Sequence, residues 1–148
     1  MYKSILVPLD GSKRAERILP HVEQLARSSN AQVVLLQVVE SNHYAYESNK
    51  QFVELDIKLA KQQVDEATRY LDTIRGEFRD KSFKVRSMVL SGSVVRNIIR
   101  VAETENVDMI AMASHGRTGL SSVFYGSVAA GILQRVDRPL LLIRAGED

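Results

Sequence analysis

A polar, glycine-containing stretch at residues 112–128 carries the residue types of this chain that best suit binding chemistry. Gly116 lets backbone amides approach an anion, and Gly126 and Ser127 open the last predicted helix, whose unpaired N–H groups and dipole favour phosphate. Arg117 adds a planar cationic group suited to phosphate. A structural alternative stays open, in which the glycines only permit turns and Ser127 only caps the helix.

Asp10 is the second candidate for a site residue, and two interpretations of it stay open. It follows the first apolar segment and precedes a predicted helix. From there it can hold a ribose hydroxyl or a phosphate-bound Mg²⁺, because hard cations prefer carboxylate oxygen. As a turn residue before Gly11, it can equally cap the helix.

Catalytic motifs are missing from the sequence. There is no Walker A motif, no Gly-x-Gly-x-x-Gly, no Gly-x-Ser-x-Gly and no His-Glu-x-x-His. A slow ATPase would need a residue that orients water near the γ-phosphate, and His115 is the obvious nearby candidate. A histidine that contacts an anion, or that is purely structural, is the simpler interpretation, so we expect no catalytic residue.

The elements that must position these residues follow from the hydrophobic pattern. Short runs rich in branched apolar residues predict strands at residues 4–7, 32–39, 84–90, 107–113 and 139–143. Continuous apolar runs are typical of a parallel sheet covered on both faces. Apolar residues three and four apart predict helices at about 13–28, 94–105 and 126–136, the first with a bend at Pro20.

One further helix is long and strongly amphipathic. Its apolar residues are spaced alternately by four and three: Val53, Ile57, Ala60, Val64, Ala67, Leu71, Ile74 and Phe78. This spacing suits a helix that lies across a sheet, and it also suits a coiled coil. We favour packing on the sheet.

Strands that alternate with helices predict an α/β fold, a doubly wound parallel sheet with helices on both faces. No linker or repeat divides the chain, so residues 1–148 are expected to form one domain. In such a sheet, ligands bind beyond the carboxyl ends of the strands, where the strand order reverses. Asp10 and the loop after residue 113 both follow predicted strands, as that rule requires.

Composition narrows the choice of partner and compartment. The 20 basic residues are nearly cancelled by 18 acidic ones, and the net charge of +2 gives no reason to expect a nucleic-acid partner. There is no cysteine, which suits a reducing compartment, and no apolar stretch approaches the length of a membrane span. We expect a cytoplasmic protein that does not enter a membrane.

Several segments, in order, resemble the universal stress protein family along nearly the whole chain. They are residues 5–12, 35–38, 108–117 and 138–143. The ATP-binding branch carries Gly-x2-Gly-x9-Gly followed by Ser or Thr. Here Gly116, Gly126 and Ser127 match this pattern, and Ala113 replaces the first glycine. The resemblance implies a Rossmann-like, five-stranded parallel sheet of order 3-2-1-4-5.

The resemblance also implies a ligand and the residues that hold it. The cofactor is expected to be ATP, or else ADP or AMP, with Mg²⁺ bridging phosphate oxygens. The expected contacts run from adenine and ribose to triphosphate: Val38, Pro8, Leu9, Asp10, Met112, Ala113, His115, Gly116, Arg117, Gly126, Ser127 and Val128. A homodimer is expected through the aliphatic strand at residues 139–143.

Three functions remain in view. The first is a nucleotide-binding regulatory module in a stress response, which needs no catalytic base. The second is the slow ATPase. The third is a nucleotide-free dimeric interaction protein, which the intact spacing from Gly116 to Ser127 disfavours.

Overall fold

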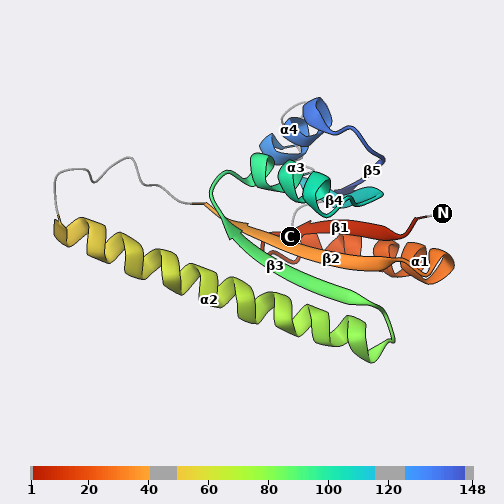
Figure 1. The fold of residues 1–148 in the computed structure, drawn as a ribbon, viewed down its shortest axis with the longest axis horizontal. Coiled ribbons are helices and arrows are strands. Elements are labelled where there is room, and N and C mark those ends of the chain that lie inside the picture. The colour runs from red at the N-terminus through yellow and green to blue at the C-terminus, as the bar shows by residue number, and fades with distance from the viewer. Residues whose placement is uncertain (1, 41–49, 116–125, 146–148) are drawn as a thin grey trace.

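The computed structural model of the chain describes residues 2–40, 50–115 and 126–145. Its five strands are β1 (Ser4–Leu9), β2 (Gln32–Val39), β3 (Val85–Ser91), β4 (Met109–His115) and β5 (Leu140–Ala145). All strand pairs are parallel and their order is β3-β2-β1-β4-β5. The sequence-based prediction of the sheet and of its strand order is therefore confirmed (Figure 1).

The helices are η1 (Ala15–Ile18), α1 (Leu19–Ser29), α2 (Lys50–Asp80), α3 (Val94–Thr104) and α4 (Ser127–Arg135). The helix predicted at residues 13–28 is found at residues 15–29, but its first turn is the 3-10 helix η1, which runs directly into α1. Pro20 lies in the first turn of α1. At that position its missing N–H group has no acceptor within α1 to lose, so the proline fits the start of α1.

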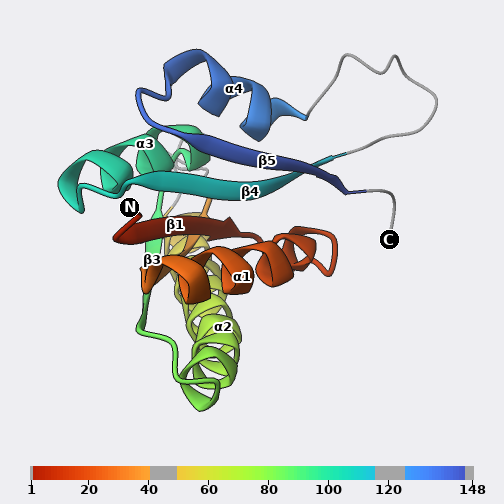
Figure 2. The same cartoon turned by 90° about the vertical axis from the view of Figure 1, so that its right-hand side faces the viewer.

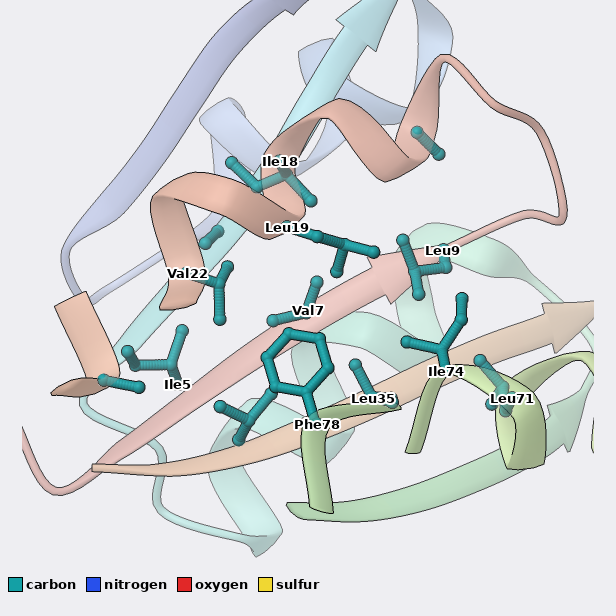
Figure 3. Packing of buried hydrophobic residues seen from close by; sticks show 14 of the residues in the cluster. Ile5, Val7, Leu9, Ile18, Leu19, Val22, Leu35, Leu71, Ile74 and Phe78 are labelled. Carbon is teal, nitrogen blue, oxygen red and sulfur yellow. The ribbon is translucent and has the colours of Figure 1, made fainter. Parts of the chain in front are cut away.

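Two apolar cores lie on opposite faces of the sheet, as the strand pattern predicted. Along β1, Ile5, Val7 and Leu9 face a core that includes residues of η1, α1 and α2. Leu6 faces the second core, which includes residues of α3 and α4. Figure 2 shows the two helical layers on either side of the strands, and Figure 3 shows the first core from close by.

Strand β1 runs two residues further than predicted, through Pro8 to Leu9. Pro8 pairs in register with Leu36 of β2, but the register between β1 and β4 covers only Ile5↔Met109 and Leu6↔Ile110. Proline has no N–H group to donate to a neighbouring strand. Strands β1 and β4 are therefore paired at their starts and unpaired at their carboxyl ends.

Helix α2 is much longer than the strands it crosses. Its 31 residues span about 46 Å, whereas the eight residues of β2 span about 26 Å. Buried contacts with the sheet are confined to its second half, where Ala67, Leu71, Ile74 and Phe78 are at most 3% exposed. Packing on the sheet is thus confirmed for that half, and the first half extends beyond the strands (Figure 1).

Candidate functional site

A cavity of about 130 Å³ lies where the strand order reverses, between the carboxyl ends of β1 and β4. The end of β1, the end of β4 and the start of α4 line it, together with residues of η1 and α3. Small-molecule pockets usually measure ~300–1,000 Å³. The cavity therefore has room for one part of a nucleotide, and the remainder of such a ligand must lie outside it.

The structure gathers most of the predicted site residues at this cavity. Eight of them line it: Pro8, Leu9, Asp10, Met112, Ala113, Gly126, Ser127 and Val128. Val38 does not line it, although its side chain packs against the core on the same α3 and α4 side. Gly116, Arg117 and the His115 side chain lie outside the described residues.

Among the described residues, no side chain caps the start of α4, where the first backbone amides of the helix lie. Gly126 is the N-cap residue, so Ser127 is the first helical residue and does not cap the helix. In α3, by contrast, the Ser93 hydroxyl caps the helix by accepting a hydrogen bond from the Arg96 N–H at 3.4 Å. The first amides of an uncapped helix and its dipole form a ready site for an anion.

Two glycines determine where α4 begins and how closely it packs on α3. Gly126 has φ 84° and ψ 157°, a conformation that side chains of L-residues rarely adopt. Gly131 faces Val95 of α3, and a Cβ atom at Gly131 would come within 2.7 Å of a Val95 methyl group. Both positions therefore require glycine if α4 is to begin at the cavity and pack closely on α3.

Ser114 carries a buried hydroxyl that lacks a partner within the described part of the chain. The residue is 2% exposed, it lines the cavity, and its Oγ makes no hydrogen bond there. A buried polar group without a hydrogen bond costs about 1–3 kcal/mol. A ligand oxygen in the cavity would remove that cost, so the hydroxyl fits a polar occupant.

Ala113 departs from the family pattern without straining the backbone. It lies in β4, paired in register with Ile143, and it is absent from the non-glycine residues with positive φ in the described chain. A methyl group at this position is therefore compatible with the strand. The cavity forms with alanine in place of the first glycine of the pattern.

Asp10 organises the turn after β1. Its Oδ1 accepts hydrogen bonds from the Ser12 N–H at 2.9 Å and the Ser12 hydroxyl at 2.6 Å, and its Oδ2 pairs with the Arg14 guanidinium at 3.1 Å. The Ser12 hydroxyl in turn accepts from the Ala15 N–H at 3.1 Å. Ser12, and not Asp10, is therefore the side chain bonded to the start of η1, while 54% of the Asp10 side chain remains exposed.

The site also contains residues that the sequence did not single out. They are Arg14 and Ala15 beside η1, Val94 and Ile98 on α3, and Ser114 and Ala129. The spacing of Val94 and Ile98 marks a helix face but not the cavity that it borders. Arg14 is the one that the sequence could best have indicated, because it lies four residues after Asp10 and can pair with it. In the structure its side chain is only 13% exposed.

A second, larger hollow lies on the other side of the end of β1, against α2. Its volume is about 470 Å³, and its lining includes the carboxylates of Asp10, Glu40 and Glu66. Tyr70 also lines it and donates a hydrogen bond to Glu16 at 3.0 Å. Burial and this bond raise the pKa of the Tyr70 hydroxyl well above its ordinary value. Because its lining includes three acidic residues, the hollow disfavours an anion.

Among the described residues, no group of three or more histidine, aspartate or glutamate side chains could hold a metal ion. Mg²⁺ often binds through one or two carboxylates together with substrate phosphates. The half-exposed Asp10 carboxylate fits that partial role, with phosphate oxygens as the remaining ligands. In the described residues, no helix is both long enough and apolar enough to cross a membrane.

Comparison with known proteins gives one consistent match. The Universal stress protein family matches residues 1–144 of the chain. A universal stress protein of Methanocaldococcus jannaschii is 31% identical, over 97% of this chain and 96% of its own. The solved structure of the Methanocaldococcus protein superimposes with a TM-score of 0.85 and covers 100% of this chain and 99% of that chain.

More distant structures share the fold. An Arabidopsis thaliana universal stress protein family member with AMP bound is 15% identical, with a TM-score of 0.66, and the alignment covers 97% of this chain and 92% of that one. A universal stress protein in complex with cAMP is 18% identical, with a TM-score of 0.59, and the alignment covers 97% and 98%. These two similarities concern the fold.

Proposed function

The chain belongs to the universal stress protein family, and we propose that it binds an adenine nucleotide, preferably ATP, and acts as a nucleotide-dependent regulatory module. The site described above supports the anion-binding part of this proposal. The proteins of the same fold that hold AMP and cAMP support the adenine part. The readout would be a change in the binding of a partner, without any need for turnover.

Electrostatics favours one orientation of the proposed nucleotide. The phosphates belong at the cavity, where the first amides of α4 and the Arg14 side chain meet. The hollow would repel them, because Glu40 and Glu66 line it and do not line the cavity. The adenosine therefore extends toward the end of β2, where the paired register with β1 stops at Leu9↔Gln37 and Val38 follows.

The observation that carries the proposal is the buried Ser114 hydroxyl beside the start of α4, which no side chain of the described residues caps. Each feature alone would destabilise the folded chain, since each leaves polar groups without partners among those residues. Together they line one cavity at the reversal of strand order. A ligand with several acceptor oxygens, such as a nucleotide phosphate, would satisfy both at once.

Ser114→Ala separates a binding role from a packing role. Without nucleotide, the variant should be at least as stable as the natural protein, because it loses a buried hydroxyl that has no hydrogen-bond partner in the described part of the chain. Its affinity for ATP should fall by about 5- to 10-fold, the equivalent of one hydrogen bond of about 1–1.4 kcal/mol. Urea denaturation and calorimetric titration measure the two quantities on the same preparation.

Ser91→Ala is the matched control, because Ser91 is exposed at the end of β3 and does not line the cavity. Its ATP affinity should equal that of the natural protein. A Ser114→Ala protein that is less stable and binds ATP unchanged would show that the hydroxyl serves packing, and the site would lose its main support.

Asp10→Asn tests the proposed contact with Mg²⁺. Asparagine keeps an acceptor oxygen for the Ser12 N–H group and removes the charge that a metal ion needs. ATP affinity should fall by at least about 10-fold in Mg²⁺ and by much less in a chelator, because one charged contact contributes about 1.5–3 kcal/mol. Equal losses under both conditions would remove Asp10 from the metal site.

We also propose that two chains associate through β5. It is an edge strand whose Leu140 to Ile143 segment is only partly buried. An aliphatic edge of this kind favours pairing with a second strand. An antiparallel pairing of the two β5 strands would give a closed two-fold dimer.

A further inference from the structure

The first half of α2 exposes large apolar side chains that nothing in the described structure covers. Val53 is 40% exposed and Ile57 is 61% exposed, and they lie on the part of the helix that extends beyond the strands (Figure 1). Leu55 and Leu59, at 53% and 49%, lie on the opposite side of the helix. This half of α2 is thus unusually apolar for a solvent-exposed helix.

Val53, Ile57, Ala60 and Val64 form one stripe, which we call the α2 stripe. It continues the alternating spacing of four and three that, from Ala67 onward, packs on the sheet. Such spacing is also that of a seam between two paired helices. The α2 stripe therefore has the pattern of a buried seam, but no element of the described residues buries Val53 and Ile57, while Ala60 and Val64 are only partly buried.

The fold restricts how a second helix can cover the α2 stripe. A parallel copy of α2 would continue along the stripe toward Ala67 and Phe78, where the sheet of the same chain already lies. An antiparallel copy would run the other way, past Lys50 and away from the sheet. Only the antiparallel orientation lets both second halves keep their own sheets.

Charge favours the same orientation. In an antiparallel pair, the side chains that flank the seam on one side meet the same flank of the other helix. Glu54 and Lys61 lie on one such flank, seven residues apart, and both are exposed. Each Glu54 would meet Lys61 of the partner subunit, which makes two symmetric pairs of opposite charge across the two-fold axis.

We propose that the α2 stripe is an interface with a second copy of this chain, formed by antiparallel pairing of the two helices. Val53 packs against the partner's Val64, and Ile57 packs against the partner's Ala60. The overlap from residue 53 to residue 64 spans about 16 Å. The interface is separate from β5, and it does not depend on nucleotide binding.

Cysteine cross-linking tests this register, because the natural chain contains no cysteine. In a Val53→Cys/Val64→Cys protein, each cysteine should lie opposite its counterpart on the partner, within the ~7 Å between Cα atoms that a disulfide allows. Within one helix the two positions are about 16 Å apart, so an intrachain bond is excluded. Mild oxidation should yield at least about five times more covalent dimer, on a non-reducing gel, than either single-cysteine protein.

Two further changes are made in the same double-cysteine protein. Ile57→Glu should abolish the cross-link by burying a charge in the seam. Leu59→Glu, on the opposite side of the helix, should leave it unchanged. The charge-swapped Glu54→Lys/Lys61→Glu pair should cross-link like the parent, whereas Lys61→Glu alone should cross-link less. Circular dichroism verifies that each variant is folded.

The proposal fails if the double-cysteine protein gives no excess of covalent dimer. It fails equally if Val53→Cys alone cross-links as well as the pair, because that would indicate a parallel seam or random collision. A cross-link that survives Ile57→Glu would show that the α2 stripe does not form the seam.

Discussion

Gly126→Val should reduce ATP affinity by at least about 100-fold, equivalent to about 2.8 kcal/mol, while the sheet and both cores stay folded. Gly126 has φ 84° and ψ 157°, which a β-branched residue adopts only at a cost of about 1–3 kcal/mol. The variant must either bear this strain or move the start of α4 away from the cavity. In the first case the valine side chain blocks the approach of phosphate, and in the second the first amides of α4 leave their position at the proposed phosphate site.

Gly76→Ala is the matched control for this change. Gly76 lies within α2, and a Cβ atom there would meet no atom within 4 Å. Its ATP affinity should stay unchanged, and its free energy of unfolding should rise by about 0.5–1 kcal/mol because alanine favours the helix. Isothermal titration calorimetry gives the affinities. Unchanged ATP affinity in a folded Gly126→Val protein would remove α4 from the phosphate site.

Phe78→Ala should lower the free energy of unfolding by about 3–5 kcal/mol, a large share of the ~5–15 kcal/mol typical of a domain. Phe78 is 2% exposed and packs in the core shared with Leu71 and Ile74 (Figure 3). Its ring centroid lies 5.4 Å from that of Phe83. The substitution would leave a cavity between α2 and the sheet that the rigid surroundings only partly fill.

Leu59→Ala provides the comparison from the same helix. Leu59 is 49% exposed, beyond the sheet and outside the α2 stripe. Its replacement should change the free energy of unfolding by no more than about 0.5 kcal/mol. Urea denaturation curves of the two variants measure this contrast. Similar losses in both, or a loss below about 1 kcal/mol for Phe78→Ala, would contradict the division of α2 into a packed half and an exposed half.

Much of the fold could be predicted from the sequence because buried parallel strands are nearly continuous apolar runs. The loss of pairing between β1 and β4 at their carboxyl ends could not be predicted, because it depends on the position of Pro8 relative to the neighbouring strand. The change from η1 to α1 next to Pro20 could not be predicted either. A proline predicts a bend within a helix but fits the first turn without strain, and the pattern alone did not place the boundary between η1 and α1.

The candidate site was predictable where it consists of strand ends, since the carboxyl ends of neighbouring parallel strands meet at one edge. Asp10 was predicted in this way, whereas Met112 was expected from the family resemblance, and both line the cavity. The role of Ser114 could not be predicted, because the burial of its hydroxyl depends on several elements at once and no local sequence pattern indicates it. The spacing of apolar residues in α2 left two interpretations open, packing on the sheet and a coiled coil. In the structure, only the second half of helix α2 packs on the sheet.

The most direct test of the proposed function is to identify and titrate the ligand itself. Freshly purified protein is denatured, the released small molecules are separated by anion exchange with absorbance detection, and the emptied protein is titrated with ATP and Mg²⁺ by calorimetry. We expect an adenine nucleotide to be released, or ATP to bind one site per chain. If no nucleotide is released and ATP does not bind, the chain is not a nucleotide-binding module, and its function lies in its interaction surfaces.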